Sequence, residues 1–109
     1  MLALTLSADG AVAQWTFTDA ADIEAFVDGS IEELPLEGSL VLLFNDNGLM
    51  RGLTHNAVAT ALVRGLGAGY SEDDTIAGDA VIVSRTDDAF RDVDDSASAL
   101  LARLGLPTP

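Results

Sequence analysis

The chain has 109 residues, 49% of them hydrophobic, with 18 acidic residues against five basic ones and a net charge of −13. This length fits one folded domain over residues 1–109, and the apolar content excludes an intrinsically disordered chain. Because cysteine is absent, disulfides, thiolate metal sites and a cysteine nucleophile are excluded as well.

The acidity argues against direct binding to nucleic acid, because proteins hold phosphates with cations and residues 1–50 contain no lysine or arginine. Two interpretations of the charge stay open. It serves solubility, reflects adaptation to high salt or follows from a GC-rich coding background. Alternatively, it imitates nucleic acid or forms a surface for a basic partner.

A membrane is not expected as a partner, since no run of about 18 apolar residues occurs. The first six residues alternate apolar with small side chains and have no basic flank. Such a pattern is typical of a strand and not of a signal peptide. We therefore expect a cytoplasmic protein.

Residues 1–17 predict an N-terminal β-hairpin, because leucines alternate before a turn at residues 8–10 and a β-prone run follows. A short helix comes next, with Asp19 as its N-cap and Asp28-Gly29 at its end. The following strand contains Pro35, which places it at a sheet edge or ends it there.

Residues 40–44 form a continuous apolar run, which predicts a buried central strand. Residues 45–48 contain Asn and Gly, which accept the positive φ of tight hairpin turns. Residues 49–53 are therefore expected to return beside that strand. A calcium loop is rejected here because no glutamate follows at the spacing of an EF-hand.

A longer helix is predicted from Thr54 or Asn56 to about Leu66, ended by the glycine-rich residues 65–69. Those glycines close a helix and do not open one, so they do not form a phosphate-binding loop. A mobile loop through residues 72–74 is expected after them.

Residues 80–83 predict a second buried strand, and the polar stretch after it lacks a metal-ligand spacing. Asp95 is expected to cap a C-terminal helix over residues 95–104, with Gly105 as its stop signal. Together these elements predict an α+β fold. It consists of a mostly antiparallel sheet of about five or six strands with two or three helices packed on one face.

Catalytic candidates are few. His55 is the single histidine, and no second histidine or cysteine accompanies it as a metal ligand. No nucleophile elbow, Walker loop or dinucleotide fingerprint occurs. We therefore expect a protein that is not an enzyme, with no metal site and no cofactor.

The central part of the chain, residues 23–83, contains an ordered series of short motifs. They are Val27-Asp28-Gly29, Ile31-Glu32-Glu33-Leu34-Pro35-Leu36, Asn45-Asp46-Asn47-Gly48-Leu49-Met50-Arg51-Gly52-Leu53, Asn56 and Ile76-Ala77-Gly78-Asp79-Ala80-Val81-Ile82-Val83. In this order and spacing they resemble a family of small domains catalogued as domain of unknown function 3846. Such domains occur mainly in bacteriophages, plasmids and their bacterial hosts, so the resemblance implies an accessory protein of a mobile element. It supplies no catalytic residues.

Residues 45–56 allow a structural and a functional interpretation. In the first, the glycines satisfy turns and the asparagines satisfy backbone groups. In the second, the loop binds a small anionic ligand or a partner loop. The candidate binding residues are Asn45, Asn47, Arg51, His55 and Asn56.

The leading functional expectation is a non-enzymatic phage or plasmid accessory protein in the cytoplasm of its host cell. It binds a host protein, basic or DNA-binding, through its acidic surface, and a specific form of this function is nucleic-acid mimicry. The alternative is a small-ligand, nucleotide-like binding protein that uses residues 45–56. The high apolar fraction also predicts a homodimer that buries a sheet face or edge.

Overall fold

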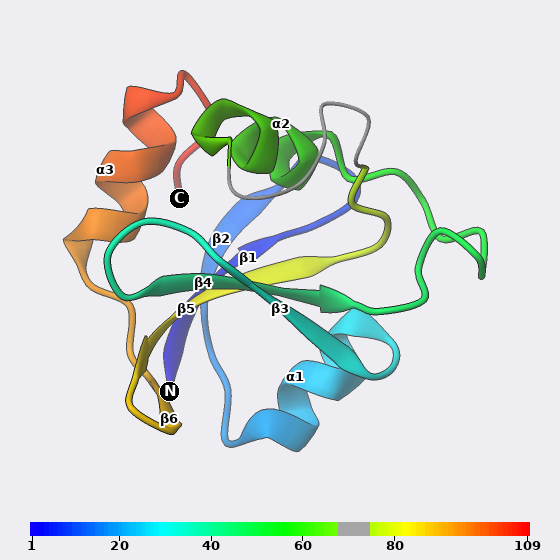
Figure 1. The fold of residues 1–109 in the computed structure, drawn as a ribbon, viewed down its shortest axis with the longest axis horizontal. Helices are drawn as coiled ribbons and strands as arrows, with labels where there is room; N and C mark the ends of the chain where they lie inside the picture. The colour runs from blue at the N-terminus through cyan, green and yellow to red at the C-terminus, as the bar shows by residue number, and fades with distance from the viewer. Residues whose placement is uncertain (68–74) are drawn as a thin grey trace.

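In the computed structural model, which describes residues 1–67 and 75–109, six strands form one antiparallel sheet and three helices flank it (Figure 1). This arrangement confirms the predicted α+β class. The elements in chain order are β1 Leu2–Leu6, β2 Val12–Thr16, α1 Ala20–Val27, β3 Ile31–Pro35, β4 Leu40–Asn45, α2 Ala57–Leu66, β5 Ala80–Thr86, β6 Ala89–Arg91 and α3 Asp95–Arg103.

The strands lie in the order β2-β1-β5-β4-β3, and the short β6 pairs with the far end of β5. The predicted N-terminal hairpin is confirmed as β1 and β2, with Leu4 opposite Gln14. β3 is an edge strand, as Pro35 predicts. The two strands that the sequence predicts to be buried, β4 and β5, lie side by side inside the sheet.

The helices lie on both faces of the sheet and not on the single face that was predicted. Side chains alternate along β4, so Leu40 and Leu42 join a core with α2 and α3. Val41 and Leu43 point the other way and pack in a second core with α1. Because both faces of β4 and β5 are apolar, each needs a helix to exclude water.

The hairpin predicted after β4 is wrong. Residues 46–52 form a series of turns, and no strand runs over residues 49–53. β4 already pairs with β3 on one side and β5 on the other, so neither of its edges is open to a returning strand. In place of a strand, this part of the chain forms an isolated antiparallel β-bridge between His55 and Ala77.

Helix boundaries follow the capping rules closely. Asn56, and not Thr54, caps α2. The N-cap of α3 is Asp94 instead of the predicted Asp95, because the Asp94 carboxylate accepts a hydrogen bond from the second residue of the helix. β6 was not predicted. The loop predicted through residues 72–74 lies outside the described residues.

Candidate functional site

Residues 46–53 form a compact loop that packs its backbone directly against the segment before β5. A Cβ atom on Gly48 would lie only 2.6 Å from the carbonyl oxygen of Ala77. Only glycine permits this close approach of two backbones. Gly48 therefore holds the loop against residues 76–77 and shapes the surface between them.

Asn45, at the end of β4, is buried and its side chain is fully engaged. Its Nδ2 donates to the carbonyl oxygens of Val27 at 3.1 Å and Asp28 at 2.9 Å. Its Oδ1 accepts a hydrogen bond of 2.8 Å from the backbone of Asn47. The side chain thus ties the end of α1 to the start of the loop.

Asn56 has a similar role at the other end of the loop. Its completely buried side chain donates to the carbonyl oxygens of Leu6 at 2.8 Å and Gly78 at 2.9 Å. Its Oδ1 accepts from the backbone N–H of Ala59 at 3.0 Å, which caps α2. These contacts confirm that Asn45 and Asn56 satisfy buried backbone groups, and they leave no free polar atom for a ligand.

Arg51 and His55 are exposed on the loop surface. Arg51 Nη2 lies 3.0 Å from Asp28 Oδ2, with 40% and 72% of the two side chains exposed, and its Nη1 donates to the Asp28 carbonyl oxygen. An ion pair this open to water contributes little to stability. Among the described residues, none bonds to the His55 imidazole.

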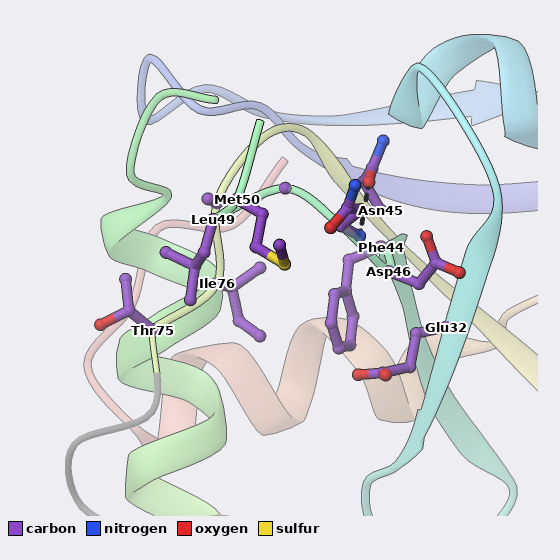
Figure 2. Close-up of a pocket in the computed structure, with 11 residues that line it drawn as sticks. Glu32, Phe44, Asn45, Asp46, Leu49, Met50, Thr75 and Ile76 are labelled. Carbon is purple, nitrogen blue, oxygen red and sulfur yellow. Dashed lines mark hydrogen bonds between the residues drawn. The ribbon is translucent and has the colours of Figure 1, made fainter. Parts of the chain in front are cut away.

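A pocket of about 260 Å³ lies between the end of β4, the loop and the segment before β5 (Figure 2). Phe44 and Ile76 form facing walls, and Met50 reaches over them. Its lining residues are Glu32, Phe44, Asn45, Asp46, Asn47, Gly48, Leu49, Met50, Thr75, Ile76 and Ala77.

The pocket brings together only part of the predicted site. Asn45 and Asn47 line it, whereas Arg51, His55 and Asn56 do not. The features that sequence reasoning missed are Leu49 and Met50, which are 63% and 89% exposed at its rim. The sequence signal for them is a pair of adjacent large apolar residues directly after a turn, a pattern that also fits the strand predicted over residues 49–53.

The chemistry of the pocket favours an apolar group over a nucleotide. Glu32 and Asp46 lie beside its apolar walls (Figure 2), and none of the described residues that line it is basic. A phosphate placed there would therefore meet carboxylates without a cation. The volume is also below the roughly 300–1,000 Å³ of most small-molecule sites. Over the described residues, no three His, Asp or Glu side chains gather as metal ligands.

A family model matches residues 1–104 of the 109. The chain belongs to the family described as Domain of unknown function (DUF3846). The DUF3846 match takes in the N-terminal hairpin and α3 as well as the central residues 23–83. No curated protein and no solved structure matches the chain. In the part that the structure describes, every helix is too short or too polar to cross a bilayer.

Proposed function

We propose that this DUF3846 domain is a non-enzymatic binding protein that holds a segment of a basic partner at the pocket beside Leu49 and Met50. The observation that carries the proposal is the exposure of these two large apolar side chains at the rim of a concave, apolar pocket. Apolar groups gathered at a hollow are typical of sites where a partner excludes water.

The surrounding charge selects the partner. Asp46 and Glu32 flank the pocket, and the whole chain carries a net charge of −13. The segment that fits best places an apolar side chain between Phe44 and Ile76 and a lysine or arginine next to the carboxylates. The negative field also speeds the encounter with a basic protein, an effect that salt screens.

The mobile-element setting implied by the family resemblance points to a protein of the host cell as this partner. A DNA-binding protein is a natural candidate, because it offers apolar and basic side chains together. Mimicry of nucleic acid is one form that such binding takes when the partner's basic surface is the one that holds DNA. In each case the domain acts in the host cytoplasm by occupying its partner.

The test begins with capture of host proteins on the immobilised domain at low and high salt. The affinity of the purified captured protein is then measured for wild type, Met50→Ser, Asp46→Asn and Asp88→Asn. Met50→Ser is expected to weaken binding about tenfold, because it removes an apolar anchor worth about 1.4 kcal/mol. Asp88, in the β5–β6 turn, serves as the matched charge control for Asp46.

Three results would contradict the proposal or a part of it. Equal affinity of Met50→Ser and wild type would show that the partner does not use the pocket. Equal losses for Asp46→Asn and Asp88→Asn would show that net charge, and not the rim of the pocket, attracts it. Binding that stays constant between low and high salt would remove the electrostatic part of the argument.

A further inference from the structure

Within residues 1–67 and 75–109, β2 is an outermost strand of the sheet and pairs with a neighbouring strand on one side only. Next to it, Met1 and Phe17 exchange two backbone hydrogen bonds of 2.7 and 2.8 Å. Since bonded and non-bonded pairs alternate along an antiparallel ladder, Val12, Gln14 and Thr16 direct their N–H and C=O groups outward. None of the described residues bonds to these outward groups.

The two edge strands of the sheet, β3 and β2, differ in the side chains that they carry. β3 carries Glu32, Glu33 and Pro35, which are the devices that keep an edge from pairing with another strand. β2 has the sequence Val-Ala-Gln-Trp-Thr, and residues 10–18 contain no charged side chain. In a chain with 18 acidic residues, β2 is thus the edge that remains open to pairing.

We propose that β2 pairs antiparallel with β2 of a second copy of this chain, about a two-fold axis at Gln14. In this register all three residues with outward N–H and C=O groups form hydrogen bonds across the dimer. Gln14 exchanges both backbone hydrogen bonds with Gln14 of the second copy, and Val12 does so with Thr16. If the two-fold axis passed through another residue of β2, some of these N–H and C=O groups would have no hydrogen-bond partner. The result is one continuous sheet across the dimer.

The side chains fit this register. Trp15, which is 60% exposed, lies opposite Ala13 of the second copy, and Phe17 lies opposite Ala11. A large residue therefore faces a small one at both positions, so the indole covers the alanine without a clash. The two Trp15 rings are diagonal neighbours across the axis, within reach of each other.

Charge favours a second copy over a basic partner at this edge. A basic protein is attracted by carboxylates, and none lies on β2. Two copies repel through their net charges of −13, but they meet here along a neutral strip. In the proposed register Asp9 approaches Asp19 of the second copy. Asp22 also lines a hollow together with Trp15 and Phe17, so repulsion remains at the ends of the strand and on the α1 side. Salt screens it, and dimerisation is expected to strengthen as salt rises.

The experiment is sedimentation velocity over a concentration series at low and high salt, with the emission of Trp15 recorded alongside. Trp15 is the single tryptophan of the chain, so a blue shift that grows with concentration reports its burial directly. Gln14→Pro removes the central outward N–H while leaving the β1 ladder intact. It is expected to raise the dimer Kd at least about tenfold, since both central hydrogen bonds are lost.

Gln14→Ala is the matched control, because it keeps the backbone donor, and its Kd is expected to stay within about threefold of wild type. A wild-type chain that sediments as a monomer up to about 0.5 mM at high salt would overturn the proposal. A dimer that Gln14→Pro does not weaken, or that forms without a shift in Trp15 emission, would overturn it too.

Discussion

Replacing Asn56 with alanine should be one of the most destabilising single changes in this domain. The side chain is completely buried and satisfies the carbonyl oxygens of Leu6 and Gly78 and the N–H of Ala59. Loss of the helix cap costs about 1 kcal/mol. Each orphaned carbonyl adds about 1–3 kcal/mol. The expected loss is about 3–7 kcal/mol, a large part of the roughly 5–15 kcal/mol that holds a domain together.

The assay is urea denaturation at one fixed protein concentration, followed by circular dichroism, with the slope of the transition compared between variants. Asn56→Asp separates the two functions of the side chain. It keeps the oxygen that caps α2 but places a carboxylate oxygen against two carbonyl oxygens, so it should be at least as destabilising as alanine. Asn47→Ala is the control, because this exposed side chain should cost less than about 0.5 kcal/mol.

A loss below about 1 kcal/mol for Asn56→Ala would refute this reasoning, since the cap alone is worth that much. It would mean that water reaches Leu6 and Gly78 once the amide is gone. A stable Asn56→Asp variant would be equally damaging, because it would show that the donor side of Asn56 is dispensable.

Three further predictions concern stability. Gly48→Ala sets a Cβ 2.6 Å from the Ala77 carbonyl oxygen, so it should lower the melting temperature and, by parting the loop from residues 76–77, weaken partner binding. Leu42→Ala, in the middle of the α2–α3 core, should cost about 2–5 kcal/mol in urea. The Ser96 side chain and backbone hydrogen bonds lower the pKa of Asp94. The cost of Asp94→Ala should therefore be fully present above about pH 4 and shrink as the pH falls below it, in denaturation curves at stepped pH.

The elements that sequence predicted well are those whose signal is local. Asp19 caps α1, the run at residues 40–44 is a buried strand, and the glycine after Leu66 ends α2 in a left-handed conformation. A continuous apolar run of this kind is also typical of a strand that is covered on both faces of the sheet. The prediction that all helices pack on one face disagrees with such a strand. In the structure α1 covers the second face, so both faces of the sheet are buried.

The failures come from partners that are distant along the chain. An Asn-Gly turn sets backbone angles, but it does not say whether the edge of the strand before it is already taken. β4 is flanked by β3 and by β5, and no property of residues 45–48 reveals this. Asn56 likewise reads as a helix cap in the sequence, whereas its bond to Leu6 spans 50 positions. The pocket also depends on contacts between distant residues, because the end of β4, the loop after it and the segment before β5 line it together.

The two proposed surfaces lie at opposite ends of the sheet, because β2 is one edge and the pocket sits beside β3 and β4. A dimer through β2 therefore leaves both pockets open. A partner with two binding segments then gains avidity, since its second contact is intramolecular. Salt acts on the two steps in opposite directions: it strengthens the dimer and weakens the attraction of a basic partner to the pocket. Binding of a bivalent partner should accordingly pass through a maximum at intermediate salt, whereas the binding of Gln14→Pro, kept at concentrations below its raised dimer Kd, should weaken steadily as salt rises.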